Sequence, residues 1–406
     1  MAGPLKGLRV LDLSRILAGP WATQCLADLG AEVIKVENPK GGDDTRTWGP
    51  PFFDNDGEPV SAYYMCANRG KQSVGIDMAT AEGQALIKQL ADESDILVEN
   101  FKVGGLKKYG LDYTSLAEAN PGLIYCSITG FGQTGPYKDR PGYDLLIQGL
   151  GGLMSITGET DDLPGGGPQR AGVAVTDLFT GMYSTVAILG ALHHRDKTGE
   201  GQHIDMSLLD TQVAVLANQG SNYLVSGTAP KRQGNSHPTI VPYQSFQTKD
   251  GYMILAVGND GQFARFCEAA GMSGLANDER FKTNPMRVKN RVALVPVVAS
   301  VIAGRTTDEW VNILEKHNVP GGPINSIDRV FADKQVEARG LRLLLEQAEG
   351  GAQMPSVANP IRYSNTEIEY RNAPPALGAQ TEETLIKVLG LTAKELTKIR
   401  SQGALG

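Results

Sequence analysis

The sequence predicts an α/β protein with a Rossmann-like, doubly wound large domain and a smaller α+β domain. Three observations predict this class. Short β-rich runs alternate with helical patterns over roughly the first third of the chain, which is typical of parallel β-α-β units covered on both faces. A hairpin pattern and further helical segments follow later in the chain. The length of 406 residues also exceeds what one hydrophobic core usually organises.

The elements of the first region follow from the period of the apolar residues. The expected strands cover residues 8–13, 32–37, 73–78, 96–99 and 123–128. The expected helices cover residues 22–29, 81–91 and 106–119. Because a parallel sheet of this kind binds its ligand at the carboxyl ends of the strands, we expect the binding site at that edge.

The second region begins near residue 224 and has a different pattern. Two apolar runs, 244–248 and 252–257, flank Lys249-Asp250-Gly251, which is a hairpin signal. A later helix begins at Thr306, with Glu309 placed for a capping box. We therefore expect a large domain of residues 1–223 plus 328–406 and a small domain of residues 224–327.

Asp177 directly precedes a long amphipathic helix. From this point the apolar residues recur at helical spacing, at Leu178, Met182, Val186, Leu189 and Leu192. Thr176 or Asp177 occupies the position expected for the N-cap. Taken alone, an aspartate in this position is far more often a cap than a catalytic residue.

Composition restricts the classes of function. The formal net charge is −7 and no long basic run occurs, which argues against nucleic-acid and membrane-surface partners and favours a small-molecule ligand. The four cysteines are far apart, so reduced thiols are expected. No secretory signal and no uncharged apolar run of about 18 residues is visible. These features predict a cytoplasmic protein, or a mitochondrial matrix protein in a eukaryote.

Several common signatures are absent from the sequence. The segment after the first expected strand, residues 14–20, lacks the glycine pattern that binds a dinucleotide. No phosphate-binding loop and no G-x-S-x-G serine motif occurs. The five histidines have no recognisable ligand spacing. We therefore expect neither a metal nor a tightly bound cofactor.

A series of ordered motifs resembles the class III CoA-transferase family. These motifs are residues 5–20, 29–37, 43–48, 68–71, 98–101, 127–136, 142–144, 170–181 and 374–378. Within that family the chain is most similar to the succinate-hydroxymethylglutarate (glutarate) CoA-transferases, through residues 46–52, 124–129 and 240–244. The resemblance covers nearly the whole chain and implies an interlocked homodimer.

The resemblance implies that Asp177 is a nucleophile that forms an aspartyl anhydride and then an aspartyl-CoA thioester. The implied donor is an acyl-CoA, most simply succinyl-CoA, and the implied acceptor is a small dicarboxylate such as glutarate, hydroxymethylglutarate or itaconate. A free aspartate has a pKa of about 3.9, so Asp177 should be ionised at pH 7 without a general base. CoA thioesters are then substrates, and no cofactor is retained.

The family also implies a set of residues that contact CoA. In this sequence they are Ile16, Leu17, Ala18, Ile76, Asn100, Phe101, Lys108 and Tyr109. Without the resemblance, Phe101 would more readily be a core residue and Lys108 a solvated helix residue. Asn38 replaces an arginine of formyl-CoA transferase, and we expect Arg46 or Lys71 to compensate.

Two further groups of residues are candidates around the nucleophile. Tyr143 stands where related α-methylacyl-CoA racemases have a histidine, which favours transfer over racemisation. Tyr143 and Asp144 are expected to position the thioester or flank Asp177, although a structural Tyr-Asp pair is equally compatible. Arg170 and then His237 are the candidates for the acceptor's second carboxylate, and Arg170 can equally be a surface charge. The alternatives are a racemase-like enzyme and a non-catalytic CoA-binding protein.

Overall fold

The computed structural model describes residues 3–348 and 350–406, and the chain divides into two compact units. The first unit runs to Leu153 and includes Ala171–Ser221 and Lys334–Gly406. The second comprises Met154–Arg170 and Asn222–Asp333. The small domain expected at residues 224–327 lies inside the second unit, which also contains the segment that leads toward Asp177.

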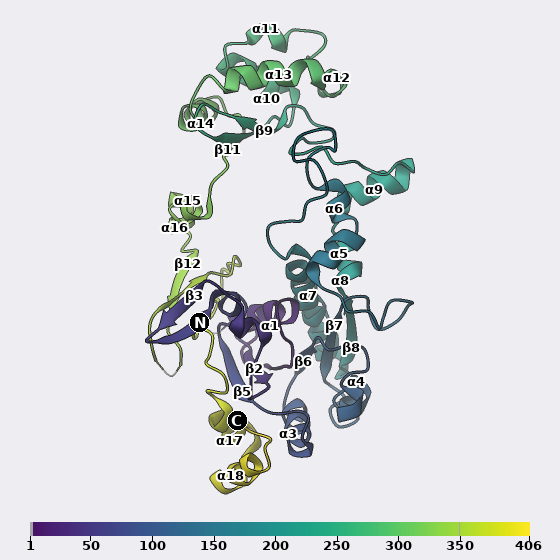
Figure 1. The fold of residues 1–406 in the computed structure, drawn as a ribbon, viewed down its shortest axis with the longest axis vertical. Helices are drawn as coiled ribbons and strands as arrows, with labels where there is room; N and C mark the ends of the chain where they lie inside the picture. Colours follow the sequence, from purple (N-terminus) through teal and green to yellow (C-terminus); the bar gives the residue numbers. More distant parts are fainter. Residues whose placement is uncertain (1–2, 349) are drawn as a thin grey trace. The chain divides into compact units, whose positions relative to one another are not determined.

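The first unit is built on a six-stranded parallel sheet, as predicted from the alternating pattern (Figure 1). Its strands are β1 (Arg9–Asp12), β2 (Glu32–Glu37), β5 (Lys71–Gly75), β6 (Ile96–Glu99), β7 (Ile124–Thr129) and β8 (Gln202–Ser207). Their order is β5-β2-β1-β6-β7-β8. The direction of winding reverses between β1 and β6, so the loops after these two strands diverge and leave a crevice for a ligand.

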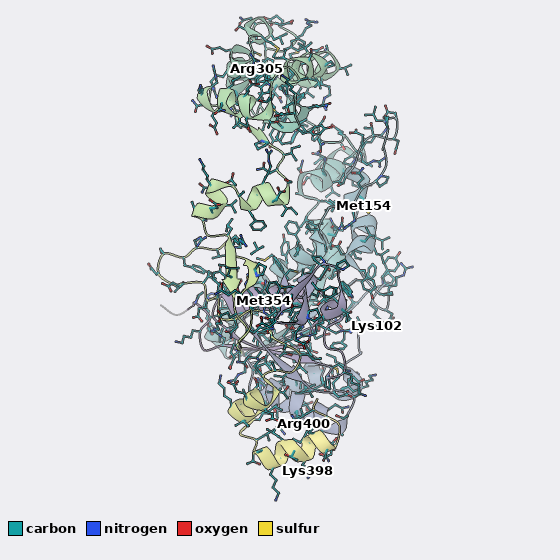
Figure 2. The ribbon with its side chains drawn as sticks, turned by 60° about the vertical axis from the view of Figure 1, so that its left-hand side comes forward. Lys102, Met154, Arg305, Met354, Lys398 and Arg400 are labelled. Carbon is teal, nitrogen blue, oxygen red and sulfur yellow. The ribbon has the colours of Figure 1, made fainter. Side chains whose placement is uncertain are left out.

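Helices cover both faces of this sheet because its strands are apolar on both sides. One face packs against α1 (Ala18–Asp28) and α7 (Val175–Thr198). The other packs against α3 (Ala81–Asp92), α17 (Thr381–Leu389) and α18 (Ala393–Ser401). In α18, Leu396 is buried in this core, whereas Lys398 projects away from it (Figure 2).

Shorter elements complete the first unit and its connections to the second. The strands form two hairpins, β3 (Phe52–Asn55) with β4 (Glu58–Ser61), and β12 (Arg342–Leu345) with β13 (Met354–Val357). The turns and helices are η1 (Asp44–Thr47), α2 (Ala62–Met65), η2 (Lys107–Tyr109), α4 (Tyr113–Ala117), α5 (Asp144–Leu150), α6 (Leu153–Ile156), α8 (Leu208–Ala214), α9 (Ala217–Ser226) and α16 (Lys334–Ala338).

The second unit contains an antiparallel sheet of β9 (Tyr243–Gln247), β10 (Tyr252–Ala256) and β11 (Gly321–Pro323). Its helices are α10 (Asp260–Ala269), α11 (Ser273–Ala276), α12 (Asn284–Lys289), α13 (Arg291–Ile302), α14 (Thr307–Lys316) and α15 (Ile327–Phe331). The β9-β10 hairpin and the capping box between Thr306 and Glu309 confirm the sequence predictions. Trp310 is fully buried in the core of this unit.

Three predicted elements differ from the structure. The helix expected at residues 22–29 is α1, which begins four residues earlier, at Ala18. The strand expected at residues 73–78 is β5, which begins two residues earlier and ends at Gly75. The helix expected at residues 106–119 is instead the turn η2 followed by the short helix α4. Gly110, at a φ of +63°, ends the first turn in a left-handed conformation that a continuous helix cannot contain.

Helix α7 buries a different face from the one its apolar stripe predicts. Its buried side consists mostly of small residues, and a side chain at Gly181 would come within 2.6 Å of the Ala18 carbonyl of α1. Met182, Val186 and Leu189 remain 39%, 62% and 37% exposed. Among the described residues, α7 is the one helix long and apolar enough to span a membrane, by length and composition alone.

Candidate active site

Asp177 lies in the first turn of α7, but it is not the N-cap. The helix begins at Val175, and the preceding Ala174 offers no capping side chain. Asp144, from the start of α5, supplies the cap instead. Its Oδ1 accepts hydrogen bonds from the backbone N–H groups of Thr176 and Asp177, at 2.8 and 3.2 Å. A carboxylate is well suited to this position because the helix N-terminus carries partial positive charge.

The capping arrangement leaves the Asp177 carboxylate without a donor. Across residues 3–348 and 350–406, no hydrogen bond to its oxygens is present, and burial raises its pKa to about 7, with the nearby Asp144 charge as the second cause. The expectation of a fully ionised Asp177 at pH 7 is therefore wrong for the unliganded enzyme. Desolvation, which the free-residue value ignores, penalises the charged form.

Gln148, one turn after Asp144 in α5, holds this arrangement together. Its amide Nε2 donates to Asp144 Oδ2 at 2.5 Å, and its Oε1 accepts from the Ala171 N–H at 3.0 Å. The Gln148 side chain is fully buried. It therefore ties the capping carboxylate to the segment that enters α7. The sequence analysis did not identify Gln148, although its i+4 spacing from Asp144 in a helix was a usable signal.

Two tyrosines lie at this end of the unit. Tyr143 is 64% exposed at the start of α5. Tyr63, in α2, was not predicted to be part of the site. Burial raises the pKa of Tyr63 to about 12, with the charges of Asp177 and Asp144 among the further causes. A phenol with that pKa keeps its proton at neutral pH and can donate a hydrogen bond to an anion.

A largely apolar cavity of about 730 Å³ adjoins the start of α7. Its wall includes the α7 residues Val175, Leu178, Phe179 and Met182. Trp21 of α1 and Cys66 after α2 also contribute to it. The paired Asp28 and Arg69 also belong to the wall, but most of the surface is apolar. Asp177 lies between Val175 and Leu178 in α7, so the nucleophile candidate stands beside this largely apolar surface, which agrees with the raised pKa of its carboxyl group.

The residues expected to bind CoA follow the carboxyl ends of several strands. Ile16, Leu17 and Ala18 follow β1, Ile76 follows β5, and Asn100 and Phe101 follow β6, whereas Lys108 and Tyr109 lie in η2. Leu17, Ala18 and Ile76 are buried. The Asn100 amide hydrogen-bonds the backbone of Arg15 in both directions, at 2.9 and 2.7 Å. The loops after β1 and β6 are therefore joined at the point where the strand order reverses.

A polar cavity of about 200 Å³ lies at the same edge of the sheet. Arg15, Asn38, Ile76 and Phe101 contribute to its wall. The Arg15 guanidinium is half exposed and pairs with Asp44 at 2.8 Å. Arg15 is thus a cation at this edge that the sequence analysis did not identify.

The expectation that Arg46 or Lys71 replaces the missing arginine is wrong. Lys71 Nζ is completely buried and pairs with Asp12 at 3.0 Å. Arg46 donates to both carboxylate oxygens of Glu37, at 2.8 and 2.7 Å. Both cations already neutralise buried carboxylates, so neither is available to a phosphate.

The residues expected to bind the acceptor, Arg170 and His237, belong to the second unit. In that unit the His237 ring lies 5.3 Å from the Tyr243 ring, and its Nδ1 accepts from the Thr239 N–H at 3.2 Å. Their role stays a prediction. Within the described residues, no group of three or more His, Cys, Asp or Glu side chains is placed to hold a metal ion.

Comparison with known proteins agrees with this geometry. The family model described as CoA-transferase family III matches residues 5–381. The succinate–glutarate CoA-transferase of Agrobacterium fabrum is 55% identical, over 95% of this chain and 96% of its own. The human succinyl-CoA:glutarate CoA-transferase is 43% identical, over 99% and 90%. A crystal structure of a CaiB/BaiF family protein from Brucella suis superposes with a TM-score of 0.86 at 51% identity, over 96% of this chain and all of the other. The chain therefore belongs to CoA-transferase family III.

Proposed function

We propose that this enzyme transfers CoA from succinyl-CoA to glutarate, with Asp177 as the nucleophile. The observation that carries the proposal is the Asp177 carboxylate itself, which lies at a helix N-terminus and has no hydrogen-bond donor among the residues that the structure describes. A carboxylate used only for capping would accept N–H groups, as Asp144 does. The similar enzymes named for succinate and glutarate support this choice of donor and acceptor.

The first half of the reaction consumes succinyl-CoA. An Asp177 oxygen attacks the thioester carbonyl, the C–S bond breaks, and an aspartyl-succinyl anhydride forms with CoA thiolate. The thiolate then attacks the aspartyl carbonyl of the anhydride. This step releases succinate and leaves an aspartyl-CoA thioester.

Glutarate completes the cycle. Its carboxylate attacks the aspartyl thioester and forms an aspartyl-glutaryl anhydride and CoA thiolate. The thiolate attacks the glutaryl carbonyl, which gives glutaryl-CoA and restores the Asp177 carboxylate. No proton is required in any of the four steps, which is consistent with a nucleophile that has no neighbouring general base.

The surrounding residues have separate tasks in this proposal. Asp144 and Gln148 fix the start of α7, and Asp144 binds the N–H groups of Thr176 and Asp177. The Tyr63 hydroxyl donates to the oxyanion that forms at the attacked carbonyl. Tyr143, which is exposed in one chain, contacts the thioester. Arg170, with His237 as second choice, binds the distal carboxylate of the dicarboxylate.

CoA binds at the carboxyl edge of the sheet, over the crevice between β1 and β6. The backbone of Ile16, Leu17 and Ala18 and the Phe101 ring line its path. Lys108 and Arg15 supply positive charge for the phosphates.

The first test is transfer by the purified protein. Succinyl-CoA is incubated with glutarate, hydroxymethylglutarate, itaconate, oxalate or formate, and new CoA thioesters are followed by mass spectrometry. Glutaryl-CoA should form with the wild type and not with Asp177→Ala. Failure to transfer CoA to any acceptor, combined with α-proton exchange on a branched acyl-CoA, would overturn the proposal in favour of racemisation.

An isotope experiment tests the covalent role of Asp177. Glutarate labelled with ¹⁸O in its carboxylates leaves the bridging oxygen of the second anhydride on Asp177. After turnover, the peptide that contains Asp177 should therefore carry ¹⁸O. A direct reaction between the two substrates would transfer label to succinate and leave this peptide unlabelled.

We further propose that two copies assemble into an interlocked homodimer. Two features support this proposal. The apolar stripe of α7 is exposed in a single chain, and exposed apolar surface of this kind is typical of interfaces. The apolar cavity of about 730 Å³ lies beside the same helix. Sedimentation velocity should give a dimer mass, and an active monomer would contradict the proposal.

A further inference from the structure

The loop between β1 and α1 has an unusual backbone conformation. Ile16 has a φ of +72°, in the left-handed region that a β-branched residue rarely adopts. In a free loop, strain of this kind disfavours the conformation by roughly 5- to 100-fold in population. Such residues persist where the surrounding structure fixes them, and they cluster at functional sites. The contacts that hold Ile16 therefore indicate a role for the loop.

Side chains from two other segments fix the backbone on both sides of this residue. The Ile16 N–H donates to both carboxylate oxygens of Asp43, at 3.2 Å each. The preceding Arg15 N–H donates to Asn100 Oδ1 at 2.9 Å, and the Asn100 amide donates to the Arg15 carbonyl at 2.7 Å. The Arg15 N–H, the Arg15 carbonyl and the Ile16 N–H thus each have a side-chain partner.

Asp43 is itself immobilised by a buried ion pair. Its Oδ2 lies 3.0 Å from Lys35 Nζ, and neither side chain is exposed. The same Lys35 ammonium donates to the Ser14 carbonyl at 2.8 Å. Thr45 adds backbone and hydroxyl hydrogen bonds to Asp43 Oδ1, at 3.0 and 2.7 Å. We call Lys35, Asp43 and Asn100 the loop clamp.

The loop clamp lies at the point where the strand order reverses. Asn100 follows β6 and the strained loop follows β1, so the clamp joins the two sides of the crevice. Arg15, Lys35 and Asp43 also contribute to the wall of the polar cavity of about 200 Å³ at this edge.

We propose that Asp43 is a positioning residue for the CoA thioester. It holds the Ile16 backbone in the left-handed conformation before the substrate binds. The backbone from Ile16 to Ala18 is then preformed, and binding does not have to order it. This inference rests on the proposed function, in which this edge of the sheet binds CoA. Asp43 acts on capture of the thioester and not on the chemistry at Asp177.

The kinetic test separates the two half-reactions. CoA is already attached to Asp177 when glutarate reacts, so a defect in capturing the thioester affects only the first half. Asp43→Asn should lower kcat/KM for succinyl-CoA about tenfold and change kcat/KM for glutarate less than about threefold. The matched control is Asp92→Asn, which removes an exposed carboxylate at the end of α3, before β6 and therefore at the opposite edge of the sheet. This control should stay within about twofold of the wild type for both substrates.

A rescue experiment distinguishes positioning from general support of the fold. Glycine adopts positive φ without penalty, so Ile16→Gly removes the strain that Asp43 offsets. In that background, Asp43→Asn should cost less than about threefold in kcat/KM for succinyl-CoA. An equal cost in both backgrounds, or an equal loss for both substrates, would overturn the inference.

A second variant covers the case in which Asp43→Asn does not fold. Asn100→Ala removes two hydrogen bonds to the loop without exposing a buried charge, and it should show the same split between substrates and the same rescue by Ile16→Gly. A cost that Ile16→Gly does not reduce would instead identify a direct contact with CoA and refute positioning. Transfer by the wild type is measured first, because its absence would refute the proposed function rather than this inference.

Discussion

The pH dependence of the first half-reaction depends on two neighbouring carboxylates. Burial and the Asp144 charge raise the pKa of Asp177 from 3.8 to about 7, and burial is the larger cause. Asp144 therefore accounts for less than half of the rise. Asp144→Asn retains an oxygen that can cap α7 but removes the charge. We expect this change to lower the pKa of Asp177 by up to about 1.5 pH units.

The expected effect on rate is large at mildly acidic pH. For the wild type, kcat/KM for succinyl-CoA should fall about tenfold per pH unit below pH 7, because the attacking carboxylate must be ionised. At pH 6 the wild type should retain about a tenth of its plateau value. A variant whose nucleophile has a pKa near 6 should retain about half. Stopped-flow or steady-state assays between pH 5 and 9 measure both curves.

Gln148→Leu provides the control for this prediction. It removes the hydrogen bond to Asp144 but keeps the negative charge, so the plateau should fall while the pH midpoint stays in place. A wild-type midpoint near pH 4 would refute the argument that burial raises the pKa of Asp177. An unchanged midpoint in Asp144→Asn with an intact plateau would refute the electrostatic role of Asp144.

Three further predictions concern stability and assembly. Because the folded-state pKa of Asp177 is raised from 3.8 to about 7, its ionisation lowers the free energy of unfolding progressively between about pH 4 and pH 7, and this loss is complete above pH 7 and absent below about pH 4. Asp177→Asn should therefore increase the free energy of unfolding by roughly 1 to 3 kcal/mol at pH 8, with no gain at pH 4 in thermal or urea denaturation. Lys71→Met should cost about 3 to 5 kcal/mol, because Asp12 would keep a buried charge without its partner; a loss below about 1 kcal/mol in urea unfolding would contradict this. Val186→Glu should reduce the proposed dimer to monomers in sedimentation velocity, and an unaltered dimer would exclude the exposed stripe of α7 from the interface.

The sequence predicted the features that depend on local pattern. The period of the apolar residues located β2 and β6 to the residue, and the alternation of strands and helices identified the doubly wound sheet. Capping signals worked where the cap is local, as between Thr306 and Glu309. The helix after Asp177 was also predicted, because 24 residues of helical sequence give a long pattern.

Two of the errors in the site share one physical origin, which is that a charge can find its partner far away in the sequence. Asp144 caps a helix that begins 31 residues later, so the local rule assigned the cap to the wrong side chain. Lys71 was a candidate to replace the missing arginine, yet its ammonium pairs with Asp12, 59 residues earlier. In the first case, the distant Asp144 makes the capping hydrogen bonds that the local sequence assigns to Asp177. In the second, the distant Asp12 pairs with the Lys71 ammonium, which is then not available to a phosphate. In the described part of the chain the Asp177 carboxylate has no donor, because Asp144 accepts the N–H groups that Asp177 would otherwise use. A carboxylate that accepts no hydrogen bond keeps its oxygens available for attack, which makes Asp177 suitable as a nucleophile.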